Sequence, residues 1–173
     1  MGPRDPLGVV RDVASDACYL INFLAVDRID LLARRTDYRI HVPLEVDAEI
    51  LRPEQRTRLR AAMDGGHLNM VELVEIPELT EYTGLLRELI GKGEAACLAI
   101  AIVRGWTVAS DERRRFGRLA RERLPDRPVI TTRATILEAV GLGHLTVEEA
   151  FAIQDALAAN HSFRMNLEPD LFR

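Results

Sequence analysis

Apolar and polar positions along the chain follow two different periods, which predict alternating strands and helices. Short β-prone runs cover residues 9–15, 38–42, 68–76, 106–110 and 128–131. Helical spacing or helix-starting residues predict helices that begin at Ala17, Pro43, Glu54, Pro77, Glu94, Arg113, Thr132 and Val147. Strands and helices that alternate at these intervals predict an α/β/α sandwich with a central parallel sheet.

The last clear helix has its own start signal. Thr146 and Glu149 have the spacing of a capping box, in which each side chain bonds the backbone N–H of the other residue. The remaining tail shows little pattern and is expected to be an arm or a docked end. The predicted organisation is a flexible leader over residues 1–8, a main domain over residues 9–145, and a C-terminal helix and arm over residues 146–173 packed on the same domain.

Composition and charge limit the function classes. Of the 173 residues, 47% are hydrophobic, which suffices for the core of one domain. A formal net charge of −4 argues against binding nucleic acid through overall charge, so such binding needs a local basic patch. The absence of a long apolar run or signal core predicts a cytoplasmic protein with no membrane association. Cys18 and Cys97 lack metal-ligand spacing and are interpreted as buried, reduced thiols.

Acidic side chains stand where predicted strands end and helices begin. Asp16 follows the first predicted strand, and Asp111 follows the fourth. The carboxyl ends of parallel strands meet at one edge of a sheet, which is where such folds bind their ligands. Glu94 begins a helix after a Gly-Lys-Gly turn, and Glu49 lies in the first turns after Pro43. We therefore expect these four acids to converge on one spot.

A cluster of four acids indicates a metal site. Carboxylates within about 4–6 Å of one another repel and raise each other's pKa, and a divalent cation relieves this repulsion. An all-oxygen donor set without His or Cys suits Mg²⁺ or Mn²⁺ rather than Zn²⁺. Such ions bind phosphate oxygens and activate water, so the predicted reaction is phosphodiester hydrolysis.

Each acid also has an ordinary structural interpretation. Asp16 and Asp111 have the position of helix N-caps, and Glu94 has that of a first-turn acid favoured by the helix dipole.

The acids after Pro43 carry a second ambiguity. Glu45, Asp47 and Glu49 could form a solvated helix face, and which of the three is the ligand stays open. The Val46-x-x-Glu49-Ile50 pattern favours Glu49.

Basic and polar residues near the acids are candidates for substrate binding. Arg113 and Arg114 open an arginine-rich stretch directly after Asp111, which is either a phosphate-binding rim or a solvated helix face. Ser15 and Asn22 are expected to assist the site by hydrogen bonding. The four histidines lack ligand spacing and are interpreted as structural or surface residues: His41, His67, His144 and His161.

Four segments in order resemble the acidic motifs of PIN-domain nucleases over residues 9–145. They are Val-Ala-Ser-Asp16, Val-Asp-Ala-Glu49-Ile, Gly-Lys-Gly-Glu94-Ala-Ala and Ala-Ser-Asp111-Glu. The resemblance implies a parallel-sheet α/β/α fold, metal-dependent cleavage of single-stranded RNA, and these four acids as metal ligands. It also implies frequent pairing as homodimers and frequent service as the VapC-type toxin bound by an antitoxin protein.

Two features set this chain apart from many relatives. The ending Asn-His-Ser-Phe-Arg-Met looks more like a longer PIN-like subgroup of uncertain function than the short toxins. Where many members of that subgroup have Gly-Thr-x-Gly, this chain has Thr131-Thr132-Arg133-Ala134, which would bring Arg133 into the cleft.

The sequence therefore predicts a Mg²⁺- or Mn²⁺-dependent endoribonuclease for single-stranded RNA. The first alternative is a PIN-like binding or regulatory module with weak or no nuclease activity. A phosphoacceptor signalling domain is disfavoured, because no Lys follows the later strands in the expected place.

Overall fold

A four-stranded parallel sheet forms the centre of the molecule in this computed structural model, which describes residues 10–35 and 37–172. The strands are β1 (Arg11–Ser15), β2 (Tyr38–Pro43), β3 (Asn69–Val71) and β4 (Thr107–Ala109). Their spatial order is β3-β2-β1-β4, and Val13 of β1 pairs with Ile40 of β2 and Thr107 of β4. The predicted leader, residues 1–8, lies outside the described residues.

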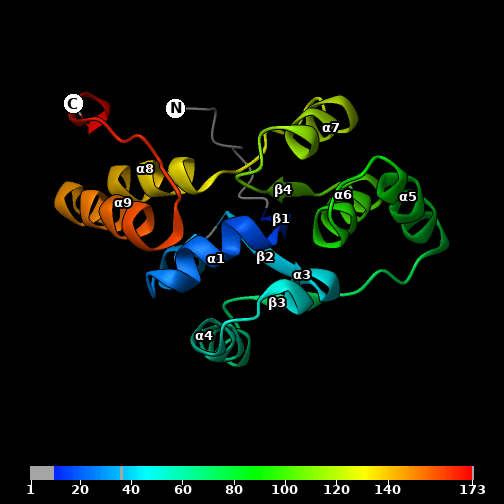
Figure 1. Cartoon of the computed structure of the whole chain (residues 1–173), viewed down its shortest axis with the longest axis horizontal. Helices are drawn as coiled ribbons and strands as arrows, with labels where there is room; N and C mark the ends of the chain where they lie inside the picture. The colour runs from blue at the N-terminus through cyan, green and yellow to red at the C-terminus, as the bar shows by residue number, and fades with distance from the viewer. Residues whose placement is uncertain (1–9, 36, 173) are drawn as a thin grey trace.

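Helices cover both faces of the sheet, which confirms the predicted α/β/α sandwich. The helices are α1 (Ala17–Ala25), α2 (Asp30–Ala33), α3 (Leu44–Glu49), α4 (Pro53–Asp64), α5 (Ile76–Arg87), α6 (Lys92–Arg104), α7 (Arg115–Arg123), α8 (Thr132–Gly141) and α9 (Val147–His161). Helices α5 and α6 lie on one side of the sheet, and α1, α8 and α9 lie on the other (Figure 1). Within the described residues, no helix combines the length and apolar composition needed to cross a bilayer.

Small side chains let α6 lie close against the strands. Every residue from Ala95 to Ala101 is fully buried, and the helix contacts β1, β2 and β4. Gly105 ends the helix in the left-handed conformation at φ 74°, which glycine adopts without steric cost. The sharp stop sends the chain directly into β4, whose far end delivers Asp111.

The C-terminal segment is a docked end. The predicted capping box is present, because Thr146 Oγ1 accepts from the Glu149 N–H at 3.1 Å and Glu149 Oε2 accepts from the Thr146 N–H at 2.8 Å. Beyond α9, Met165 and Leu167 are buried, and a short 3-10 helix, η1 (Pro169–Phe172), ends the described chain. The packing of α9 on α1 and α8 joins this segment to the rest of the fold.

The third strand is much shorter than the predicted run of residues 68–76. β3 ends at Val71, and Val74 and Ile76 are 62% and 79% exposed. The carboxylate of Glu78 accepts hydrogen bonds from the Val74 N–H at 2.9 Å and the Glu75 N–H at 3.1 Å. These N–H groups are therefore not available to the β-ladder, so the alternating pattern overestimated the length of the strand.

The predicted strand at residues 128–131 is wrong for a related reason. Only Ile130 bridges the sheet, opposite Ala109, with its N–H donating to the Val108 carbonyl at 2.9 Å. Helix α8 begins two residues later, which leaves no room for a longer ladder. Two helix starts differ from the prediction by two residues, because Glu94 is the third residue of α6 and α7 begins at Arg115, while α3, α4 and α5 start one residue away from the predicted positions.

We expect Glu78→Ala to lower the free energy of unfolding by about 3 kcal/mol, because it breaks a buried ion pair. Glu78 is fully buried and pairs with Arg104, whose side chain is 26% exposed. Chemical denaturation at pH 7 measures the change, with Glu72→Ala as the control because Glu72 is exposed and contacts Arg104 through its backbone carbonyl. Equal stability of the two variants would contradict the structural role of this pair.

Candidate metal and nuclease site

Asp16 stands at the junction of β1 and α1 and is only 3% exposed. Its backbone N–H donates to the Ala109 carbonyl at 2.9 Å, which ties the junction to β4. Although Asp16 has the N-cap position, its side chain makes no capping hydrogen bond. The Cys18 thiol at 2.9 Å and the Ser110 hydroxyl at 3.0 Å both donate to its Oδ2. The carboxylate is therefore oriented by two neutral donors rather than used to cap the helix.

Asp111 lies in the loop after β4 and is held by α8 and α1. Thr132 donates twice, from its N–H to Oδ1 at 3.0 Å and from its hydroxyl to Oδ2 at 2.5 Å. Asn22 of α1 donates to Oδ2 at 3.1 Å, and its role in assisting the site stays a prediction. Burial raises the pKa of the Asp111 carboxyl, and these hydrogen bonds oppose that shift.

Glu49, the last residue of α3, reaches the start of α6. Its Oε1 accepts a hydrogen bond from the Gly93 N–H at 2.8 Å. A Cβ atom on Gly93 would lie 2.8 Å from this oxygen, so the contact requires glycine. Removal of the carboxylate from water raises the pKa of Glu49, and the nearby charge of Asp16 adds to this effect.

The other two acids of α3 have different surroundings. Asp47 forms an ion pair with Arg60 at 2.9 Å. Glu45 has a buried Oε2 without a hydrogen-bond partner within the described structure, whereas Glu49 accepts from the Gly93 N–H of α6. The geometry therefore favours Glu49 among the three candidates.

Glu94 completes the group from the first turn of α6. Its Oε2 accepts from the Gly91 N–H at 2.7 Å, so it closes the helix start. Burial raises the pKa of Glu94, and the charges of Asp16, Glu112 and Glu49 raise it further. The sequence did not predict Glu112 as a neighbour of these acids, although it directly follows Asp111 in the chain.

The acids thus fall into two linked parts. The charges of Asp16, Glu49 and Glu94 act on one another. Asp111 is held by its own hydrogen-bond donors. Cys18 links it to Asp16, because the Cys18 sulfur accepts from the Asp111 N–H at 3.2 Å. Cys18 is only partly buried, so its prediction as a buried structural thiol is wrong. Burial and the Asp16 charge raise the pKa of this thiol to about 12, which keeps it a neutral donor.

The donor set fits a hard divalent cation in its chemistry. Across residues 10–35 and 37–172, no Arg or Lys forms an ion pair with Asp16, Glu49, Glu94 or Asp111. Oxygen ligands with uncompensated negative charge are what Mg²⁺ and Mn²⁺ prefer. As the described side chains stand, no three Asp, Glu, His or Cys residues lie close enough together to hold one ion.

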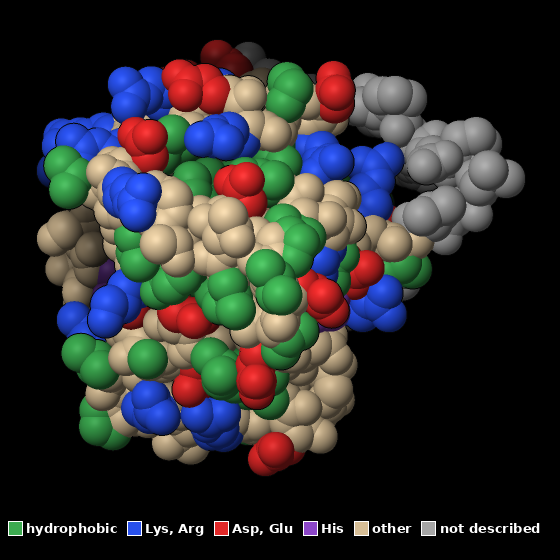
Figure 2. Space-filling model, turned by 90° about the vertical axis from the view of Figure 1, so that its right-hand side faces the viewer, with side chains coloured by type: hydrophobic (Ala, Val, Ile, Leu, Met, Phe, Trp, Pro, Cys, Tyr) green, Lys and Arg blue, Asp and Glu red, His purple; other side chains and the backbone are tan. Residues whose placement is uncertain are grey.

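Several arginines of the predicted phosphate-binding rim bind other groups of the protein itself. Arg115 donates to a backbone carbonyl at 2.9 Å, and Arg118 and Arg123 pair with acids at 3.9 and 3.8 Å. Arg113 and Arg114 are exposed in the loop between β4 and α7. On the side of the molecule that carries α5 and α7, positive and negative side chains are interspersed (Figure 2). The positive charge nearest the acids therefore comes from this loop rather than from the whole helix.

The remaining two candidates differ in access. Ser15 is fully buried and its hydroxyl donates to the backbone carbonyl of Asp16 at 3.4 Å, so it supports the site from beneath. Arg133 is half-buried at the second position of α8, beside Thr132. The sequence did not reveal Ser110 and Thr132 as donors to the acids, because small hydroxyl residues after strands most often serve turns and caps.

A family model described as a PIN domain matches residues 12–167 of this chain. The chain belongs to the PIN-domain family. PIN domains are generally nucleases, and the matched residues include all four predicted acids. Among solved structures, the chain is similar to VapBC2 from Rickettsia felis bound to a DNA fragment from its promoter, with a TM-score of 0.48, 16% identity, and coverage of 69% of this chain and 96% of the other. No curated protein matches the chain.

In this PIN domain, we expect Gly93→Ala to separate activity from stability. The added Cβ displaces the Glu49 carboxylate, while alanine in the first turn of α6 is as good a helix former as glycine or better, by up to about 1 kcal/mol. Any metal-dependent nuclease activity should fall at least about tenfold, as for loss of a supporting contact at a metal site. Gly84→Ala on α5 is the control, since a Cβ there meets open space. Unchanged activity with Gly93→Ala would remove Glu49 from the site.

Neutralising one acid should stabilise the metal-free PIN domain. The folded-state pKa of Glu94 is raised, so its contribution to stability is present below the unfolded-state pKa and is lost as pH rises through the folded-state value. Glu94→Gln should therefore give a higher melting temperature than wild type at pH 7 in EDTA, with the difference vanishing near pH 4. The matched control is Glu88→Gln on the exposed end of α5. A lower melting temperature for Glu94→Gln at pH 7 would show that its hydrogen bond outweighs the repulsion.

Proposed function

We propose that this PIN domain is a Mg²⁺- or Mn²⁺-dependent endoribonuclease that hydrolyses phosphodiester bonds of single-stranded RNA. The observation that carries the proposal is the set of carboxylates at the carboxyl edge of the sheet, none of which forms an ion pair with an Arg or Lys in the described structure. Keeping several negative charges together costs stability, and a bound cation offsets that cost.

The proposed ligands are Asp16, Glu49, Glu94 and Asp111. Cys18 and Ser110 hold the Asp16 carboxylate through Oδ2, so Oδ1 is the oxygen directed at a ligand. Asn22 orients Asp111 from the opposite side. The chemistry that a bound Mg²⁺ or Mn²⁺ supplies is an activated water and a stabilised leaving oxygen.

Substrate binding is assigned to the basic residues around this edge. Arg113 and Arg114 are exposed directly after Asp111 and would contact RNA phosphates, and Arg133 would contribute from α8. With a net charge of −4, attraction for RNA must come from local basic residues such as these, so binding should weaken steeply with salt.

The toxin role is a narrower proposal of the same kind. PIN-domain membership supports it, with an antitoxin protein as the partner and a homodimer as the assembly. Growth arrest on induction of the wild-type chain, absent with an inactive variant, tests the toxin role. Sedimentation of the purified chain tests the dimer.

A binding or regulatory module without nuclease activity is the second candidate. Two observations favour it: the described acids do not form a ready-made group of three, and Asp111 already accepts three hydrogen bonds. A Mn²⁺ titration separates the two candidates. A nuclease site should raise the melting temperature in a saturable way, whereas a module without a metal site should match its neutral variant.

We expect Asp16→Asn to reduce Mn²⁺-dependent cleavage of a mixed single-stranded RNA pool by at least about 100-fold, since outer contacts alone are worth about 10–100-fold. The variant should unfold cooperatively, because the amide oxygen can still accept from Cys18 and Ser110. Asp126→Asn is the control, since Asp126 is exposed next to Arg127, which contacts the start of β4 at the opposite end from Asp111. Wild-type rates for Asp16→Asn, or equal cleavage in EDTA, would refute the assignment.

A further inference from the structure

A cleft of about 560 Å³ opens beside the acids, and Arg113 and Arg114 are not among the described residues that line it. Cys18, Asn22 and Glu49 line the end that faces the acids. The other end is built from the start of α4 and the end of α9, which are far apart in sequence. This volume lies within the range of about 300–1,000 Å³ that small-ligand sites occupy. The cleft is therefore large enough for one nucleotide unit next to the proposed reaction centre.

Arg52 supplies the positive charge of this cleft. It is exposed, and its Nη1 lies 3.4 Å from Nδ1 of His161 at the end of α9. Within the described residues it has no carboxylate partner, unlike Arg58 and Arg60 on α4, the helix that follows it, which pair with acids at 3.2 and 2.9 Å. A guanidinium without an acid partner in a cleft is suited to bind a phosphate.

The remaining walls combine apolar and amide groups. Ile21, Leu51 and Phe163 contribute apolar surface, and Leu51 is 76% exposed. Gln55 and Asn160 contribute amides that can both donate and accept hydrogen bonds. Apolar and aromatic surface next to a cation and amides is the chemistry that binds an unpaired base and its phosphate.

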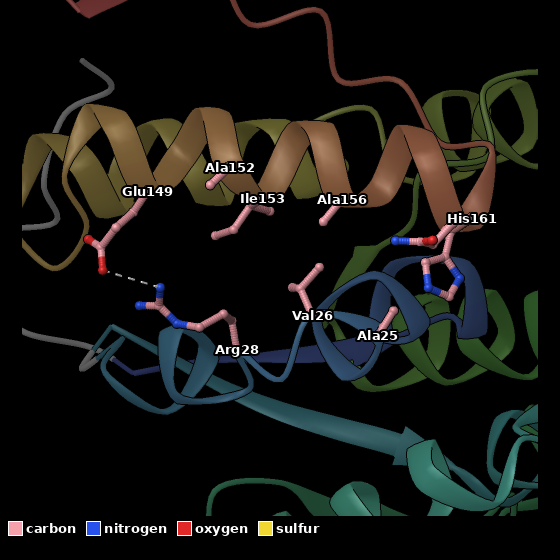
Figure 3. A pocket seen from close by; sticks show the side chains of 9 residues that line it. Ala25, Val26, Arg28, Glu149, Ala152, Ile153, Ala156 and His161 are labelled. Carbon is pink, nitrogen blue, oxygen red and sulfur yellow. Dashed lines mark ion pairs between the residues drawn. The ribbon is translucent and has the colours of Figure 1, made fainter.

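A neighbouring pocket of about 330 Å³ shows the contrast. It lies between α1 and α9 on the other side of His161, and Ala25, Val26, Ile153 and Ala156 point into it (Figure 3). Its cation, Arg28, faces Glu149 at 3.8 Å and also pairs with Asp30 at 3.0 Å. The arginine of this pocket is thus already paired with acids. Of the two pockets, the Arg52 cleft is the one whose arginine has no carboxylate partner among the described residues.

We propose that the Arg52 cleft binds the nucleotide adjacent to the scissile phosphate of a single-stranded RNA, and this rests on the proposed nuclease function. Its phosphate contacts Arg52, which His161 holds in place, and its base lies against Ile21 and Phe163. The cleft then acts as a second anchor for the strand, in addition to Arg113 and Arg114.

The test measures RNA affinity in a chain that does not cut. In the full-length Asp16→Asn background with Mg²⁺, Arg52→Gln should raise the Kd for a labelled single-stranded RNA of mixed sequence about tenfold. It should also lower the slope of log Kd against log salt by about 0.7, the value of one phosphate contact on a single strand. Arg52→Lys should recover part of the affinity because it keeps the charge.

The control is Arg87→Gln, which removes one exposed positive charge from α5, across the sheet from α9 (Figure 1). Equal Kd and slope for Arg52→Gln and Arg87→Gln would overturn the proposal. Cleavage by the otherwise wild-type chain is measured in parallel. RNA binding that depends on Arg52, without any cleavage, would retain this binding site and reject the nuclease, whereas cleavage unaffected by Arg52→Gln would retain the nuclease and reject the binding site.

Discussion

Repulsion among acids at one edge of the sheet is the constraint on which the site depends. The order β3-β2-β1-β4 places β1 beside β4, so Asp16 and Asp111 leave the sheet at neighbouring points. Glu49 and Glu94 come to the same edge from α3 and α6, and their pKa values are raised. The hydrophobic core must offset this cost when no cation is bound, and the buried residues 95–101 of α6 and 13–15 of β1 adjoin Glu94 and Asp16 in the chain.

Neutral donors, rather than opposite charges, hold the acids in place. Hydroxyl, thiol, amide and backbone N–H groups contact Asp16 and Asp111, and the first turn of α6 supplies N–H groups to Glu49 and Glu94. A neutral donor orients a carboxylate while leaving its charge available to a cation. An arginine in the same place would satisfy the acid and remove its use as a ligand.

The sequence predicted the candidate site residues whose position follows from adjacent strands and helices. Asp16 directly follows β1 and Asp111 lies two residues after β4, so the predicted strands placed both at the sheet edge. The shortening of β3 escaped prediction because the Glu78 carboxylate, several residues later, takes the backbone donors that would extend the ladder. Cys18 was taken as a buried thiol because its contact with Ser110 joins residues 92 positions apart. Arg52 and His161, separated by 109 positions, were equally invisible as a pair.

The shape of the Arg52 cleft bears on the selection of single strands. A base can enter a nucleotide-sized cleft only if it is unstacked and unpaired, since a duplex keeps both faces and the pairing edge of each base engaged. The phosphate contacts at Arg113 and Arg114 alone would accept a duplex as readily as a single strand, because they read charge and not bases. Under the proposed function, selectivity for single strands would therefore come from the cleft between α4 and the end of α9. Loss of the Arg52 contact would accordingly weaken discrimination between single-stranded and duplex RNA, beyond its effect on affinity.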